Sequence, residues 1–294
     1  AYNYDRRYLL EASIRYDGSS VFGRDVRWAS FPSVAAGWAF SQENFMRDIW
    51  YLSYGKFRAS WGRSGQKFQE AYLAHGLMEE SNNFMGESGL QPGEMANSHL
   101  TWEKSDQYDL GLDLEFLNSR IKVRADYYYK HSHDLLMQVP TPGNFFISKN
   151  IWTNASAISN EGLELDVNAS LYRTKEFSWD LGLNISRNWN KFLSSYDGKD
   201  LNDKVLGRPM YGIYTYRDEG IVQNESQIPY YYNQEGKRVP LSFGSLSHPL
   251  RPGGRKIKDQ NGDGIINSND LYYAGSALPV AQGGITNTFT YKNF

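Results

Sequence analysis

The chain has 294 residues, and 31 Lys and Arg against 33 Asp and Glu give a formal net charge of −2. This balance gives no electrostatic reason to expect nucleic acid as a partner. The chain contains no cysteine, which excludes a disulfide framework and thiol chemistry. It has no run of about 18 apolar residues that would predict a transmembrane helix. Its first ten residues lack the apolar segment of a signal peptide.

Three strands are predicted in the first part of the chain, at residues 8–16, 33–40 and 54–61. Apolar and polar residues alternate in each, which is the period of a β-strand with one apolar face. A polar connection, residues 17–30, joins the first two strands, and a shorter link joins the second to the third. The third strand leads into a long stretch, residues 62–100, that is rich in Gly, Ser and Asn.

The clearest pattern lies at residues 107–130. Leucines alternate with polar residues in the first arm, and an equally regular second arm follows the polar pair Asn118 and Ser119. This predicts a β-hairpin with one apolar and one charged face. Each arm alternates over about ten residues, whereas ordinary strands have about five or six. Ten tilted residues match the apolar band of an outer-membrane barrel.

The second half of the chain continues this pattern. A long loop is expected at residues 134–157, followed by strands at 163–171 and 177–185 with a short turn, Arg173–Glu176, between them. A last strand is expected at 284–294.

The connections between these strands alternate in length: long, short, long, short, long, short, very long. The last one, residues 194–282, is too long for a structureless loop, and short strands are expected near residues 211–222. Such alternation is typical of an up-and-down barrel with short periplasmic turns and long extracellular loops. The predicted fold class is therefore all-β, an antiparallel up-and-down transmembrane β-barrel whose long connections face outside.

The alternation also assigns the two faces of each strand. An Arg or Lys at the bilayer midplane costs about 2–4 kcal/mol, so the charged face is expected in the lumen. The residues predicted to face the lumen are Asp113, Arg124, Glu164 and Asp180. Those predicted to face lipid are Tyr8, Leu10, Leu112, Leu114, Val123, Tyr127, Leu165, Val167, Leu181 and Leu183.

Five stretches, spread over nearly the whole chain, resemble blocks of the SusC/RagA-like TonB-dependent transporters. They are RYDGSSVFG to SQENFM (residues 15–46), ISNEGLELDV (158–167), GRPMYGIYTYRDEGIVQ (207–223), KDQNGDGIINSNDLYYAG (258–275) and the final PVAQGGITNTFTYKNF.

The resemblance implies part of a 22-stranded barrel in the outer membrane of a Gram-negative bacterium, typically of the Bacteroidota. It implies a plug inside the barrel, a SusD-like surface lipoprotein as a lid, and uptake of glycans or peptides energised through TonB. On this comparison the chain is a piece of the barrel. The plug and the TonB-contacting segment would lie before residue 1, and further strands would lie beyond both ends.

The sharpest local motif is the twelve-residue stretch Asp259–Asp270. Oxygen donors fall at the spacing of a calcium-binding loop, and Gly264 stands where such a loop turns sharply. The stretch departs from an EF-hand because its last position is Asp and no helix is expected before it. The alternative is a solvated turn. The candidate ligands are Asp259, Asn261, Asp263, the carbonyl of Ile265, Asn267 and Asp270.

Loop aromatics form a second candidate group. They could stack on sugars or contact a lid protein, or they could pack within the loops or at the membrane interface. The run from Tyr230 to Tyr232 is the strongest candidate for such a contact. The other residues in the group are Phe145, Phe146, Trp152, Tyr211, Tyr214 and Tyr216.

His131 and His133 share a strand face, but no third ligand is evident, so hydrogen-bonded histidines are expected there rather than a metal site. No Ser/His/Asp grouping, P-loop or paired-carboxylate motif indicates an enzyme.

Three functions remain open on the residues alone: active transport across the outer membrane, a passive porin or structural barrel, and a soluble carbohydrate-binding module. The long strands with large aromatics along one face disfavour the third.

Overall fold

The computed structural model describes residues 1–46, 48–69, 73–84, 86–141, 150–201, 204–232 and 236–292. The chain forms two compact units, one of Ala1–Met210 with Pro279–Phe294 and one of Tyr211–Leu278. Among the described residues, no helix has the length and apolar character needed to cross a membrane.

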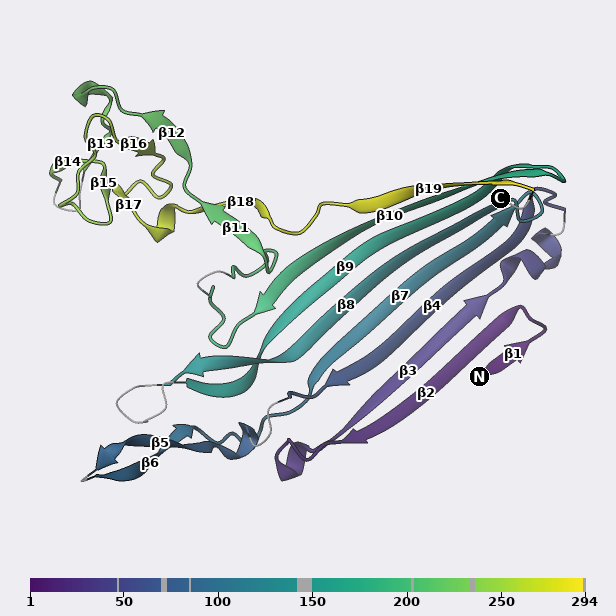
Figure 1. Cartoon of the computed structure of the whole chain (residues 1–294), viewed down its shortest axis with the longest axis horizontal. Helices are drawn as coiled ribbons and strands as arrows, with labels where there is room; N and C mark the ends of the chain where they lie inside the picture. Colours follow the sequence, from purple (N-terminus) through teal and green to yellow (C-terminus); the bar gives the residue numbers. More distant parts are fainter. Residues whose placement is uncertain are drawn as a thin grey trace. The chain divides into compact units, whose positions relative to one another are not determined.

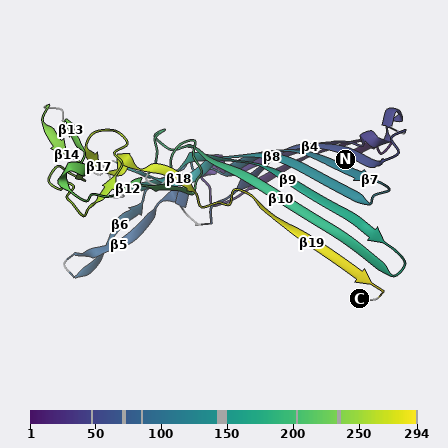
Figure 2. The same cartoon turned by 90° about the horizontal axis from the view of Figure 1, so that it is seen from above.

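The first unit is built on one antiparallel sheet of nine strands, each of which pairs with its neighbours in the order β1-β2-β3-β4-β7-β8-β9-β10-β19 (Figure 1). All eight predicted long strands are present, which confirms the antiparallel all-β fold. The sheet is open, with β1 and β19 at its edges (Figures 1 and 2). The strands are β1 (Tyr2–Tyr4), β2 (Tyr8–Gly18), β3 (Trp28–Trp38), β4 (Leu52–Gln66), β7 (Glu103–Phe116), β8 (Ile121–Pro140), β9 (Asn150–Arg173), β10 (Phe177–Ser194) and β19 (Gln282–Tyr291).

The register follows the sequence alternation. Leu112 faces Ala125 across the β7–β8 pair, and Asp113 faces Arg124. The turn between these strands puts Leu117, Asn118 and Ser119 at φ values of 54°, 57° and 63°. Residues opposite each other in a sheet share a face, so the aliphatic and charged residues of this hairpin lie on opposite sides. The predicted hairpin and its two faces are confirmed.

The strands run further than the sequence predicts. Much of the expected loop 134–157 is paired, because β8 continues to Pro140 and β9 begins at Asn150. Strand β3 begins at Trp28 rather than residue 33. Within 62–100, β4 continues to Gln66 and a separate hairpin forms. These extensions lack a regular alternation of aliphatic and polar residues, and Phe31 and Trp152 within them pack in or against a hydrophobic cluster. The hairpin consists of β5 (Leu77–Phe84) and β6 (Glu87–Glu94).

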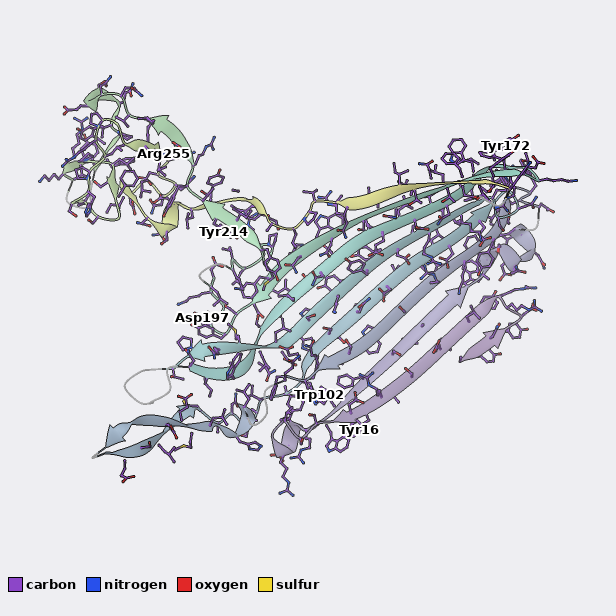
Figure 3. The ribbon with its side chains drawn as sticks, viewed as in Figure 1. Tyr16, Trp102, Tyr172, Asp197, Tyr214 and Arg255 are labelled. Atoms are coloured by element: carbon purple, nitrogen blue, oxygen red, sulfur yellow. The ribbon has the colours of Figure 1, made fainter. Side chains whose placement is uncertain are left out.

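A hydrophobic cluster closes the end of the sheet that carries the long connections. Phe22 is fully buried, with its ring centroid 4.9 Å from that of Phe68 and 4.7 Å from that of Trp102. The Trp102 indole donates to the carbonyl of Arg27 at 3.2 Å. Figure 3 labels Trp102 at this end of the sheet and Tyr172 at the opposite end, near the tight turns. The cluster, which sequence alternation did not reveal, consists of Phe22, Phe31, Phe68, Leu73, Ala74, Leu100 and Trp102.

The opposite end carries the short turns, and a polar clamp holds one of them. The Glu43 carboxylate accepts from the Tyr8 hydroxyl at 2.6 Å, the Trp38 indole at 3.2 Å and the Arg7 guanidinium at 3.5 Å. The hydrogen bonds from Tyr8 and Trp38 lower the pKa of Glu43 below its usual range. The link between β3 and β4 is therefore tied to the start of β2.

The second unit has short paired strands around its own core of Val222, Leu241, Leu250 and Ile266. The sequence predicts short strands near residues 211–222, and β11 and β12 lie there. The strands are β11 (Gly212–Thr215), β12 (Asp218–Ile221), β13 (Tyr230–Tyr232), β14 (Arg238–Pro240), β15 (Ser242–Phe243), β16 (Arg255–Ile257), β17 (Ile265–Ile266) and β18 (Tyr272–Ser276). Six 3-10 turns complete the described secondary structure: η1 (Arg24–Val26), η2 (Phe40–Gln42), η3 (Asn44–Met46), η4 (Leu73–His75), η5 (Glu225–Gln227) and η6 (Ser268–Asp270).

Candidate functional site

The charged face of the sheet carries a network of ion pairs across β4, β7 and β8. Arg58 makes a two-pronged contact with Asp113, with Nε at 2.8 Å and Nη2 at 3.0 Å from the two carboxylate oxygens. The same Nη2 reaches Asp126 at 2.7 Å, and Arg124 reaches Asp113 at 3.3 Å. Charges of both signs therefore balance one another on the face predicted to line the lumen.

Gly111 makes room for this network. A Cβ at this position would lie 2.5 Å from the Arg58 guanidinium carbon and 2.6 Å from a carboxylate oxygen of Asp126. The glycine therefore lets the arginine lie flat across β7 and reach the strand beyond it.

The opposite face is apolar and exposed. Leu110 and Ile185 are each 47% exposed, and Ile285 is 70% exposed. A sheet that leaves this many large apolar side chains uncovered needs an apolar surrounding. Two of the aromatic contacts on this sheet lie near opposite ends of the aliphatic stretch. They are Trp179 with Phe289 at 5.6 Å, and Tyr108 with Tyr129 at 6.4 Å between ring centroids.

The predicted contact aromatics lie in different surroundings. On β13, Tyr230 and Tyr232 are 45% and 75% exposed, whereas Tyr231 packs against the core of the second unit. Burial, and then the charge of Asp259, raise the pKa of Tyr231. Tyr211 is exposed at the start of this unit.

The remaining aromatics of this group come from the expected loop 134–157. Trp152 lies on β9 rather than in a loop, and it packs against the cluster around Trp102. Phe145 and Phe146 lie outside the described residues. Tyr232 and Tyr211 are therefore the most exposed side chains of this group, whereas Tyr230 has the Arg238 guanidinium over its ring, 4.2 Å from the centroid.

The calcium-like loop folds around its own amide groups. The two oxygens of Asp259 accept from the N–H groups of Gly262 and Gly264, both at 2.7 Å. Asp263 accepts from the N–H of Ile265 at 2.7 Å and from the Asn261 side chain at 2.9 Å. A carboxylate oxygen that accepts one such bond keeps a second lone pair for another partner.

Asp270 closes the loop. Its carboxylate is fully buried and accepts from the N–H groups of Gln260 and Asn267, both at 2.8 Å. Asn267 in turn caps η6 by accepting from the N–H of Asn269 at 2.8 Å, and its amide donates to the Ile265 carbonyl at 3.2 Å. Hydrogen bonds between groups of the protein itself therefore hold the loop in its conformation.

No three His, Cys, Asp or Glu side chains lie together as a metal site anywhere in the described part of the chain. The predicted calcium set also draws on Asn261, Asn267 and the carbonyl of Ile265, so calcium binding here stays a prediction.

The two histidines share one face of β8, as predicted. Their ring centroids lie 5.3 Å apart, and the rings are stacked. His133 reaches Asp106 through Nε2 and Asp134 through Nδ1, both at 3.2 Å. Asp106 is also held by Arg63 at 2.8 Å. His133 therefore belongs to a hydrogen-bonded cluster near the loop end of the sheet, and His131 stacks on it.

A family model described as "TonB dependent receptor-like, beta-barrel" matches residues 1–275. The chain belongs to this family. TonB-dependent receptor P26 of Formosa agariphila is 34% identical over 99% of this chain, and TonB-dependent receptor SusC of Bacteroides thetaiotaomicron is 31% identical over 100% of it. The chain spans only 30% and 29% of the length of these two relatives.

A solved structure shows the same fold. The RagAB peptide importer in its "closed-closed" state matches 98% of this chain with a TM-score of 0.76 and 22% sequence identity. The match covers 30% of that chain. This chain therefore shares its fold with one part of that longer chain.

We expect Gly111→Ala to push Arg58 away from Asp126 and to destabilise the barrel by about 1 kcal/mol, because it breaks a partly exposed ion pair. Gly182 lies on the same face, where a Cβ would meet its nearest atom at 3.3 Å, so Gly182→Ala is the matched control. The measurement is the temperature at which the barrel loses its folded mobility on a detergent gel. Equal shifts for the two variants would contradict the role given to Gly111.

If calcium binds the loop 259–270, millimolar Ca²⁺ will slow protease cleavage within residues 211–278 of the full-length protein, and a chelator will reverse this. Asp263→Asn will remove the protection. Asp270→Ala will speed cleavage with or without Ca²⁺, because it leaves two backbone N–H groups without an acceptor. If Ca²⁺ does not change the rate at which the wild-type protein is cleaved, the loop is only a hydrogen-bonded turn.

Proposed function

We propose that the whole protein, of which this chain forms part of the barrel, imports nutrients across the outer membrane of a Gram-negative bacterium. On the basis of its relatives, we propose that this bacterium is similar to the Bacteroidota. The observation that carries this is the family match over residues 1–275. The geometry supports it, because one face of the sheet is apolar and exposed whereas the other is lined by paired charges. A transmembrane barrel needs this division between lipid and lumen.

The proposals for the energy source and the lid are based on the relatives. TonB is the proposed energy source, because the curated relatives are TonB-dependent receptors and one of them is SusC. TonB would act through a part of the protein outside this chain. A SusD-like surface lipoprotein is the proposed lid, and Tyr230, Tyr232 and Tyr211 are its proposed contacts. The proposed cargo is a peptide or a glycan, and the similar RagAB structure is that of a peptide importer.

The alternative is a passive porin, which would share the barrel and its charged lumen. A soluble carbohydrate-binding module is disfavoured because such a protein would expose Leu110, Ile185 and Ile285 to water. No catalytic role is proposed for the described residues, since the family consists of receptors and transporters.

Uptake by whole cells separates active import from a passive pore. Cells with the full-length protein should accumulate a labelled peptide or oligosaccharide pool above the outside concentration, and collapse of the proton-motive force should abolish this. A deletion strain provides the control. Uptake that only equilibrates, and that persists without a proton-motive force, would support the porin instead.

A further inference from the structure

On the aliphatic face of β10, the side chains change from apolar to partly charged along the strand. From the turn end it presents Trp179, Leu181, Leu183 and Ile185, and then Arg187, Trp189 and Lys191. The pairing with β19 is regular from Phe177 to Ser186, so no bulge changes the face between Leu181 and Ile185. The pairing with β9 continues this register, with Arg187 opposite Leu163 and Trp189 opposite Glu161. Arg187 is therefore a cation on the face that otherwise meets lipid.

Arg187 differs from the other cations near it on this face. Arg63 pairs with Asp106 at 2.8 Å, Lys104 pairs with Asp134 at 3.1 Å, and Lys191 pairs with Glu161 at 3.5 Å. Within the described residues, no carboxylate lies within ion-pair distance of Arg187. Its guanidinium instead lies over the ring of Trp189, 4.7 Å from the centroid.

The position of Arg187 along the strand fits the edge of the membrane. It lies ten residues beyond Phe177, the first residue of β10. Ten residues span about 33 Å along a strand, and a tilt of about 40° reduces this to roughly 25 Å along the membrane normal, the height of the apolar band. Arg187 is thus placed where lipid headgroups begin, beside a tryptophan of the kind that marks this boundary.

Arg187 is one of the residues that line an apolar hollow of about 570 Å³ on this face. Its walls are aliphatic and aromatic side chains from β4, β7, β8, β9 and β10, and the small Ala125 lies among them. The lining side chains on this face include Phe57, Leu110, Leu112, Tyr127, Leu163 and Ile185.

We propose that this hollow and Arg187 together bind one lipid of the surrounding membrane that carries a phosphate group in its head. The acyl chain would lie in the hollow, and the phosphate would accept hydrogen bonds from the guanidinium. The proposal rests on the proposed position of the barrel in a membrane, but not on what the protein transports.

The chemistry favours a phosphate over a neutral head. Placing a guanidinium that has no carboxylate partner next to lipid costs free energy unless an anion binds to it. Its planar set of donors fits two phosphate oxygens at once, and stacking on Trp189 holds that plane in place.

The test uses native mass spectrometry of the full-length protein in detergent with two lipids that share their acyl chains. Dioleoyl phosphatidic acid carries the phosphate, and a dioleoyl galactosylglycerol does not. We expect the wild-type protein to bind phosphatidic acid about five-fold more than the galactolipid, and Arg187→Gln to remove this preference. Ala125→Trp, which fills the hollow, should reduce the binding of both lipids.

Arg124→Gln is the matched control, because Arg124 is also exposed but lies on the charged face. It should leave the preference unchanged. The proposal is overturned if Arg187→Gln keeps the preference, or if both arginine variants lose it equally. If Arg187→Gln does not fold, the wild-type protein decides, because equal binding of the two lipids contradicts the site. A failure of nutrient uptake would leave this readout unaffected, so the two proposals fail separately.

Discussion

The structure depends on one constraint: a strand in contact with lipid must satisfy every backbone polar group through its neighbours while keeping charge off the lipid-facing side. The ladder from β2 to β10 meets the first demand by continuous antiparallel pairing. The period of two meets the second, because a slip of one residue would turn Arg58 and Asp113 toward lipid. Strand length, register and the choice of side chains are thus set by a single requirement.

The same constraint explains how the charged face is arranged. Arg58 spans from Asp113 to Asp126 because Gly111 leaves the space between them. Charges that line a lumen can meet water, yet here they are paired across three strands. Beyond the apolar band of the sheet this constraint no longer applies, and the residues of the first unit there form a hydrophobic cluster and a histidine–carboxylate cluster.

Sequence alternation predicted the features that contact with lipid requires. These are the eight long strands, their two faces and the two tight turns. It did not predict the outer parts of β8 and β9, because apolar and polar residues do not alternate regularly there. It also missed the packing of Phe22 with Trp102, since contacts between connections distant in the chain have no local signal. For the calcium-like loop, the spacing of the oxygen donors is visible in the sequence, and the structure adds that Asp259 and Asp270 accept hydrogen bonds from backbone N–H groups.

We infer that the aliphatic face of the sheet contacts lipid and that the opposite face contacts water. The chain has no cysteine, so single cysteines at the adjacent β10 positions Leu183 and Asn184 can each carry a fluorophore in the full-length protein. In bilayers with brominated acyl chains, the label at 183 should be quenched strongly, and the label at 184 should be quenched instead by aqueous iodide. Equal quenching at both sites, or the reverse order, would contradict the account.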